Sequence, residues 1–375
     1  MVEKPGPTPG LLLFMAKTES LSLLEPLLSL PTAPFHERFV SAFLREQLVR
    51  FGIAFTSDEY GNIIARSGGE AELALVAHMD HPGFEIVSAS VASADAAWYG
   101  GVDARYFRGA GVVVYDQDSG AVVARGTIRK MRKNAAGRVE AMTLAIKGRV
   151  RAGDFGTWSL VGFRRTGGII HTKGADDLVG CAAILLTLKR LQTKGVATGV
   201  RGVFTRGEEY GFLGTLGMIR SRALPRDVKV ISVETSKALP GVVLGGGPVI
   251  RLGDRASMFD HRMVYFMDAV ARDLAKSDGR FRFQRRVMDG GTCEATPYQL
   301  AGHIAGGVAI PLHNYHNQGK TRIGAEAVAL RDVEAAVDLL TELARRLGDF
   351  DAIGEELKKR IESGWEQHGD RLRRG

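Results

Sequence analysis

The sequence predicts an α/β fold: a mixed, largely parallel sheet flanked by helices, with a small all-β domain inserted into it. The first observation is a set of short, continuous apolar runs, such as Leu73–Ala77 and Val200–Thr205, which are typical of strands buried on both faces. The second is that helix-period segments lie between such runs, as parallel strands require. The third is a change of residue pattern over residues 89–167, where short β-type runs alternate with Gly, Asp and Asn turns.

The helix and strand pattern places residues 1–88 and 168–375 in one discontinuous domain. A loose, Pro-rich leader is expected up to about Pro9, and Val40, Leu44 and Leu48 then recur at helical spacing within residues 34–50. The other expected elements, in order, are strands at Ile63–Ala65 and Leu73–Ala77, a helix at Leu178–Leu191, strands at Val200–Thr205 and Val228–Val233, a helix near Met263–Ala275, a strand at Gly307–Ile310, and helices at Ala325–Leu347 and Asp351–Arg374. The last helix is highly charged, and we expect it on the surface.

The segment between these two parts, residues 89–167, shows no long helical period. Its β-type runs include Gly111–Tyr115, Ala121–Ala124 and Met142–Ile146. We therefore expect it to form a small barrel-like domain of its own.

Composition limits the classes of function. The formal charge is +8, with basic residues gathered at Arg129–Lys133, Arg280–Arg286 and Lys358–Arg374. Aromatic residues rarely interleave with them and no nucleic-acid module motif occurs, so we interpret the charge as solvated surface and expect no nucleic-acid partner. The apolar run Leu11–Met15 is too short for a signal peptide, and no run is long enough to span a bilayer. Two cysteines form no disulfide framework or zinc finger, which favours a reducing, cytoplasmic setting.

Acids and histidines follow several of the predicted strands. In an open, largely parallel sheet, ligands bind beyond the carboxyl ends of the strands. Nitrogen and oxygen ligands delivered to one such edge suit zinc, cobalt or manganese. The residues concerned are His78 and Asp80 after Leu73–Ala77, Glu208 and Glu209 after Val200–Thr205, Glu234 after Val228–Val233, His316 after Gly307–Ile310, and the pair Asp176 and Asp177 before Leu178–Leu191.

Each of these motifs has an ordinary structural role when it is taken alone. A single His after a strand is more often structural, and Asp176-Asp177 before a helix is a normal N-cap signal. Glu208-Glu209 is a common solvated helix start, and His316 lies in a polar loop. Their joint occurrence in this order favours a metal site over separate structural roles.

In its motifs the chain resembles the tetrahedral (glutamyl) aminopeptidase family of the dinuclear zinc exopeptidases. The resemblance extends from about residue 30 to residue 345, in family order and at family spacing. The matching stretches are Val76–Asp80 with Gly83-Phe84, Gly100–Asp103, Lys173–Asp177 with Gly180-Cys181, Thr205–Gly211, Leu244–Pro248, Gly290–Thr292 and Pro311–His316.

The resemblance implies a role for each matching residue and two divalent metal ions per chain, with zinc expected and cobalt or manganese as alternatives. It implies that His78 and Glu209 hold one ion and that Glu234 and His316 hold the other. Asp176 would bridge the two ions, and the bond from Asp176 to Asp177 would be cis.

The other implied roles concern catalysis and assembly. Asp80 would accept a hydrogen bond from His78 and fix its ring, and Glu208 would be the general base. The inserted β domain would shape the substrate entrance and contribute to a homo-oligomer acting on peptides.

Departures from the family pattern fall on the substrate side of the site. Glu234 stands where relatives usually have Asp, His81-Pro82 replaces an acid and Ile, and Asn317 replaces Ser. Glu294 comes shortly after Gly290–Thr292, near where relatives carry an acid, and we expect it to bind the substrate's free amine. The alternative is that Glu294 caps a helix or pairs with an arginine of Arg280–Arg286.

Other functions remain open at this point. A related amidohydrolase, such as a carboxypeptidase, dipeptidase or deacylase, would use the same metals and would need an arginine where an aminopeptidase needs an acid. A metal-free scaffold would be expected to lack Glu208 or a ligand, yet all are present. A glycosidase needs two unencumbered carboxylates, and no Gly-x-Ser-x-Gly nucleophile motif occurs.

Overall fold

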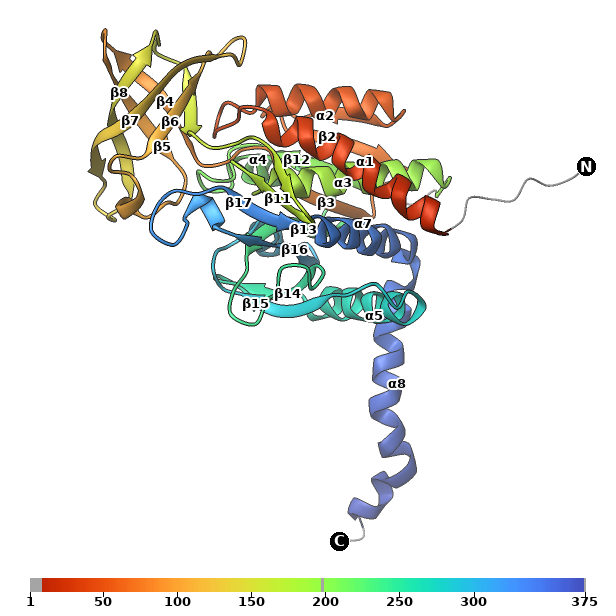
Figure 1. Cartoon of the computed structure of the whole chain (residues 1–375). Helices are drawn as coiled ribbons and strands as arrows, with labels where there is room; N and C mark the ends of the chain where they lie inside the picture. Colours follow the sequence, from red (N-terminus) through yellow and green to blue (C-terminus); the bar gives the residue numbers. More distant parts are fainter. Residues whose placement is uncertain (1–8, 197–198, 374–375) are drawn as a thin grey trace, which may run out of the picture.

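The computed structural model describes residues 9–196 and 199–373, which form a large α/β domain, a small barrel and a projecting C-terminal helix (Figure 1). Within these residues, no helix combines the length and apolar character that a membrane crossing requires.

The α/β domain is built on an 11-stranded mixed sheet with the order β1-β2-β12-β3-β13-β16-β17-β11-β10, and β14 and β15 extend it beside β16. Its centre is parallel: β3 pairs with β12 on one side and with β13 on the other, and β13 pairs with β16. The strands are β1 (Ala54–Ser57), β2 (Ile63–Ser67), β3 (Leu73–His78), β10 (Arg164–Thr166), β11 (Ile169–Thr172), β12 (Val200–Thr205), β13 (Lys229–Lys237), β14 (Val249–Asp254), β15 (Gln284–Met288), β16 (Ala305–His313) and β17 (Glu326–Ala329).

Helices cover the sheet and bury its apolar side chains. The helix α3 (Leu178–Thr193) is buried along most of its length and contacts β3, β13, α1 and α7, so it lies at the centre of the main core. Figure 1 shows α8 extending away from the rest of the molecule. The other helices are α1 (Pro9–Ser29), α2 (Arg38–Arg50), α4 (Leu213–Ser221), α5 (His261–Ser277), α6 (Ala295–Leu300), α7 (Leu330–Arg345) and α8 (Phe350–His368).

The inserted domain is a closed antiparallel barrel with the strand order β4-β5-β8-β7-β6-β9. Its own core contains Trp98, Phe107 and Trp158, whose rings contact one another. It begins at Gly83 and ends at Trp158, so the expected bounds of 89 and 167 are each several residues late. Its strands are β4 (Gly83–Ala89), β5 (Ser93–Tyr99), β6 (Gly111–Tyr115), β7 (Val122–Lys133), β8 (Val139–Gly148) and β9 (Phe155–Trp158).

The α/β domain differs from the expectation in two features. The helix expected over Ala325–Leu347 begins only at Leu330, because Glu326–Ala329 pairs as β17 between β11 and β16. The helix α1 was not expected, and it begins where the leader was expected to end. The leader itself, residues 1–8, lies outside the described residues, as does Arg374 at the end of the expected charged helix.

Candidate metal centre and active site

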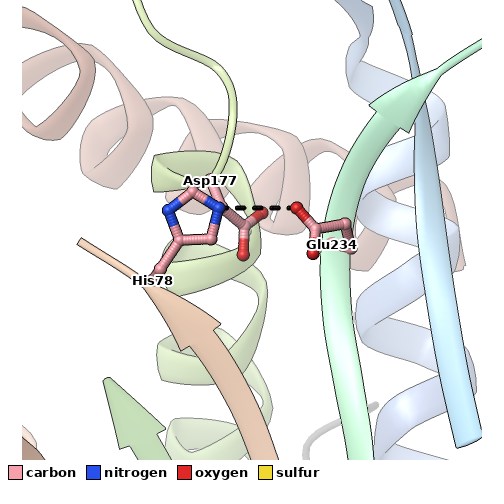
Figure 2. Close-up of side chains that lie close together, drawn as sticks. All are labelled: His78, Asp177 and Glu234. Carbon is pink, nitrogen blue, oxygen red and sulfur yellow. Dashed lines mark ion pairs between the residues drawn. The ribbon is translucent and has the colours of Figure 1, made fainter. Parts of the chain in front are cut away.

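His78 is the last residue of the buried central strand β3, and its ring lies among carboxylates (Figure 2). Its Nε2 atom is 3.3 Å from Oδ1 of Asp176 and 3.4 Å from Oε1 of Glu234. Burial alone would lower the pKa of His78, but Glu208 and the other surrounding carboxylates outweigh it and raise that pKa well above its usual range. The parallel strands β3 and β13 thus bring an imidazole and an acid to the same edge of the sheet.

Asp176 lies between the two histidines of the site. Its Oδ1 faces His78, and its Oδ2 is 3.4 Å from Nε2 of His316. The peptide bond from Asp176 to Asp177 is cis, as expected. The two histidines oppose the effect of burial and hold the pKa of Asp176 below its usual range. One carboxylate therefore connects two groups of potential ligands.

The second group forms around His316. Its Nε2 is 2.9 Å from Oε1 of Glu209, and its ring stacks on Tyr315 with 3.8 Å between ring centroids. Its Nδ1 lies 2.8 Å from the backbone oxygen of Gly101, which is in the segment that follows β5 of the barrel. His316 has a φ of 53°, an uncommon value for a residue other than glycine.

The structure corrects the expected pairing of the ligands. His78 is grouped with Glu234 rather than with Glu209, and His316 is grouped with Glu209 rather than with Glu234. Asp177 also lies within ligand reach of His78 and Glu234, although its Oδ1 accepts a hydrogen bond of 2.9 Å from Thr235. Asp176 differs from Asp177 in that its two oxygens face different histidines.

The residues present fit a pair of divalent cations. Asp176 Oδ1 and Glu209 Oε1 are buried and accept no hydrogen bond, although histidine nitrogens lie within 3.3 and 2.9 Å of them. The carboxylates of the site outnumber its two imidazoles, and buried negative charge is costly without compensation. Imidazole and carboxylate ligands together suit zinc, manganese or cobalt.

Glu208 faces this centre from the loop after β12. Its Oε2 is 3.7 Å from Nε2 of His78, and its side chain lines the adjoining cavity. Burial, together with the nearby acids Glu234 and Glu209, raises the pKa of Glu208 well above its usual range despite the opposing effect of His78. A carboxylate so placed can exchange a proton with a water bound between the two ligand groups.

Asp80 lies beside the ring of His78 and also supports the loop after β12. The backbone oxygen of Asp80, rather than its carboxylate, lies 3.0 Å from Nδ1 of His78, and the carboxylate Oδ1 is 3.6 Å away. The carboxylate instead accepts hydrogen bonds of 3.0 Å from the backbone N–H groups of Glu208 and Glu209. Asp80 therefore fixes the loop that carries the expected base and one of the ligands.

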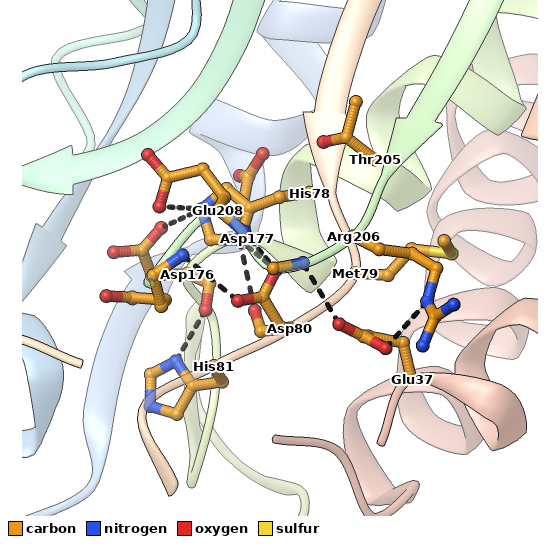
Figure 3. Close-up of polar contacts among 12 residues, drawn as sticks. Glu37, His78, Met79, Asp80, His81, Asp176, Asp177, Thr205, Arg206 and Glu208 are labelled. Carbon is orange, nitrogen blue, oxygen red and sulfur yellow. Dashed lines mark hydrogen bonds and ion pairs between the residues drawn. The ribbon is translucent and has the colours of Figure 1, made fainter. Parts of the chain in front are cut away.

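Glu37 supports the same loop from the segment before α2 (Figure 3). It accepts hydrogen bonds from the backbone N–H of Gly207 and from the side chain of Arg206. Glu37 was not expected in the site, since a single acid before a helix resembles an ordinary N-cap.

Two further residues around Asp176 were also missed. Glu326, at the start of β17, accepts backbone hydrogen bonds from Ala175 and Asp176 through Oε2 and from His316 through Oε1. The ring of His81 contacts the backbone oxygen of Asp176 (Figure 3). Its other nitrogen lies 3.0 Å from the side-chain oxygen of Asn317. The signal for His81 was its departure from the family pattern, whereas Glu326 was hidden in a segment interpreted as helix.

A small cavity of about 30 Å³ adjoins the centre. Asp176, Glu208 and Glu234 line it on one side, and Arg251, Lys237, Met288 and the segment Gly290–Thr292 line it on the other. Arg251 is almost completely buried, and its Nη1 donates a hydrogen bond of 3.0 Å to Ser236.

Glu294 does not line this cavity, contrary to the expectation that it binds substrate. It is completely buried, and one carboxylate oxygen accepts hydrogen bonds from the hydroxyls of Thr205 and Thr215. Of the two alternatives, the first holds in position only: Glu294 is the N-cap residue of α6 but makes no side-chain capping hydrogen bond there, and no described arginine pairs with it. Its side chain therefore lies in the core and not in the cavity.

The sequence model of the M42 glutamyl aminopeptidase family matches residues 61–339, which include every ligand and base named above. The chain belongs to this family. The match spans both parts of the α/β domain and the whole barrel, so it confirms the resemblance inferred from the motifs. M42 members are peptidases, and the chain is accordingly a hydrolase of the peptidase class.

Solved structures share the fold of this M42 chain. A TET aminopeptidase from a marine sediment archaeon of the Thaumarchaeota matches with a TM-score of 0.74 and 20% identity, over 89% of this chain and 99% of its own. An aminopeptidase of Desulfurococcus kamchatkensis matches with a TM-score of 0.71 and 22% identity, over 88% and 95%. A TET peptidase of Pyrococcus horikoshii, described as assembling into a tetrahedron or a large octahedral shell, matches with a TM-score of 0.70 and 21% identity, over 87% and 99%.

Proposed function

We propose that the protein is a metal-dependent aminopeptidase that removes N-terminal residues from peptides with the help of two divalent cations. The proposal rests on the position of Asp176. Its Oδ1 lies 3.3 Å from Nε2 of His78, and its Oδ2 lies 3.4 Å from Nε2 of His316. One cation would be held by His78, Asp176 and Glu234, and the other by Asp176, Glu209 and His316. Zinc is the expected metal, with cobalt or manganese as alternatives.

When bound, two such cations lower the pKa of a shared water and polarise the scissile carbonyl. The side chains of the protein do the rest. Glu208 takes the proton of the attacking water and later delivers it to the leaving amine. Asp80 keeps Glu208 and Glu209 in register through their backbone N–H groups, so that base and ligand approach the same point.

One observation favours a second candidate, a related amidohydrolase that recognises a free carboxylate. The small cavity beside the candidate centre, called the catalytic cavity below, is lined by Arg251. Glu294, the acid expected to bind an amine, lies outside this cavity. Against this, the guanidinium of Arg251 already donates a hydrogen bond to Ser236 within the protein. Family membership favours the aminopeptidase.

The deciding experiment uses metal-stripped protein refilled with zinc, cobalt or manganese. We would measure hydrolysis of free peptides, their N-acetylated twins and their C-terminally amidated twins. An aminopeptidase cleaves the free and amidated peptides and leaves the acetylated ones largely intact. Cleavage of acetylated peptides at equal rates would instead assign the protein to the carboxypeptidases or deacylases.

We also propose that the protein is a homo-oligomer assembled partly through its barrel, and that it works in the cytoplasm. The support for assembly is the fold shared with the Pyrococcus horikoshii peptidase, which forms a tetrahedron or an octahedral shell. The support for the compartment is that both cysteines, Cys181 and Cys293, are buried free thiols. Light scattering at micromolar concentration tests the first point, and a monomer there would contradict it.

A further inference from the structure

A second, wider cavity adjoins the catalytic one, and its charged walls are basic. It has a volume of about 450 Å³ and shares Lys237 and Tyr315 with the catalytic cavity. Its charged and imidazole side chains are Arg105, His171, Lys237 and His313, and no carboxylate is among its lining residues. We call it the basic cavity.

The fold brings these four residues together from distant parts of the chain. His171 in β11 and His313 in β16 both pair with Ala327 of the strand β17 between them, so the two histidines lie in one row across three strands. Residues in one such row point to the same face of a sheet. Because the side chain of Ala327 is small, it leaves space between the imidazoles of His171 and His313.

Arg105 reaches the basic cavity from the barrel side. Its guanidinium donates a hydrogen bond of 3.0 Å to the hydroxyl of Tyr106 and lies over that ring. Among the described residues its ion-pair partner is Asp103, with 3.7 Å between the charged atoms, and both side chains are more than half exposed. Such an exposed pair contributes little, so Arg105 stays available for another anion.

Position along the sheet relates this cavity to the peptide bond that would be cut. Lys237 follows the proposed ligand Glu234 by three residues in β13, a path of about 10 Å along an extended strand. The basic cavity adjoins the catalytic cavity at Lys237 and Tyr315, and Tyr315 stacks on His316. The leaving part of a bound peptide would therefore extend into the basic cavity.

We propose that the basic cavity binds a carboxylate of the substrate, two or three residues beyond the scissile bond. That carboxylate is the α-carboxylate of a short peptide or an acidic side chain of a longer one. The inference rests on the proposed aminopeptidase function and adds a preference for substrates that are anionic on the leaving side. Arg105 and Lys237 supply the permanent positive charge, and the imidazoles of His171 and His313 supply hydrogen-bond donors.

The test compares matched peptides that share the N-terminal residue and the scissile bond. A tripeptide with a free C-terminus is compared with its amide, and a hexapeptide with Glu at its third position is compared with the same peptide carrying Gln. We expect kcat/KM to be at least about tenfold higher for the carboxylate member of one pair, mainly through KM. The pair that shows the effect identifies the source of the carboxylate.

Two variants test whether the preference for the carboxylate depends on residues of the basic cavity. Arg105→Gln combined with His313→Gln should reduce the preference to within about threefold while hydrolysis of the amidated tripeptide stays at the parent rate. Arg108→Gln is the matched control, because Arg108 is an exposed arginine of the same segment that does not line the basic cavity. It should keep the full preference.

The outcomes distinguish a failure of this inference from a failure of the proposed aminopeptidase function. Equal rates for both members of both pairs overturn the basic cavity as a carboxylate site and leave the aminopeptidase intact. A preference that survives in the double variant does the same. If the reconstituted protein cleaves no peptide, the proposed function fails and this inference fails with it.

Discussion

His316 and Glu326 are joined by a hydrogen bond of 2.8 Å, which the backbone N–H of His316 donates to one carboxylate oxygen of Glu326. The other oxygen of Glu326 accepts the N–H groups of Ala175 and Asp176. A single buried acid from β17 thus sets the spacing between a histidine and the bridging carboxylate of the proposed centre.

Replacing Glu326 by Gln should weaken metal binding. The amide offers one acceptor oxygen where three N–H donors converge, and its NH₂ group faces donors on the other side. Loss of a residue that orients ligands typically costs 10–100-fold in metal affinity, so we expect a decrease of about that size. Metal titration by calorimetry measures it, and Glu366→Gln on the exposed surface of α8 is the control. Parent-like affinity would show that Glu326 only supports the fold.

Glu208→Gln should abolish most turnover and leave metal content unchanged. The amide cannot accept a proton, and general-base catalysis contributes roughly 10²–10⁴-fold. We expect about two metal equivalents per chain in both the parent and this variant. His316→Ala should lose activity and about one equivalent together, because it removes a proposed ligand. Measurement of metal content and kcat on the same samples separates the two roles, and a fully active Glu208→Gln would refute the base assignment.

Asp80→Asn should disturb the loop after β12. Both carboxylate oxygens of Asp80 accept a backbone N–H, from Glu208 and Glu209, and Asn retains only one acceptor oxygen. We expect kcat to fall about 10–100-fold with metal affinity reduced in parallel, since Glu209 is a proposed ligand. Steady-state kinetics and metal titration together provide the readout. Unchanged kcat would mean that Glu37 and the rest of the loop suffice.

Lys173 should give the protein a measurable dependence of stability on pH. It is buried between the barrel and the end of α1, where its Nζ donates to Tyr115 and to the backbone of Ser29, and burial lowers its pKa to about 8. From pH 8 to 10 the unfolded chain keeps Lys173 protonated while the folded protein does not. The free energy of unfolding contributed by Lys173 should therefore rise with pH, by up to about 1.4 kcal/mol per unit.

Denaturant unfolding of the parent and Lys173→Met at pH 7, 8, 9 and 10 checks this. The difference in free energy of unfolding, parent minus variant, should increase between pH 8 and 10. Lys147→Met removes an exposed lysine of the barrel and should show no such trend. A flat difference for Lys173→Met would mean that Lys173 remains charged in the folded protein.

The buried strands could be predicted from the sequence because their signal is local. Val200–Thr205 and Gly111–Tyr115 have the expected bounds, and Leu73–Ala77 needs only His78 added. A continuous apolar run of strand length, bounded by turn residues, indicates a buried strand without knowledge of its neighbours in the sheet. The short segment Glu326–Ala329 was misinterpreted because it runs directly into a strongly helical sequence, and only pairing with β11 and β16 makes it a strand.

The sequence predicted which residues form the candidate site, but it did not predict which acid lies beside which histidine. Strand order places β3 between β12 and β13, so Glu209 and Glu234 both lie on strands next to that of His78 or directly after them. The path of the loop after β12 decides which acid meets which histidine, and that path depends on Asp80 and Glu37, far away in sequence. Glu294 was misplaced for a similar reason: its orientation is set by Thr205 and Thr215, which no local pattern reveals.

The barrel separates His78 from Asp176 along the chain, and this has a consequence for biosynthesis. A ribosome adds residues at about 5–20 per second, so His316 emerges on the order of ten seconds or more after His78. The proposed ligand set is therefore incomplete until His316 has been made. The proposed metal centre can therefore form only after the last strands, including β16, have joined the sheet.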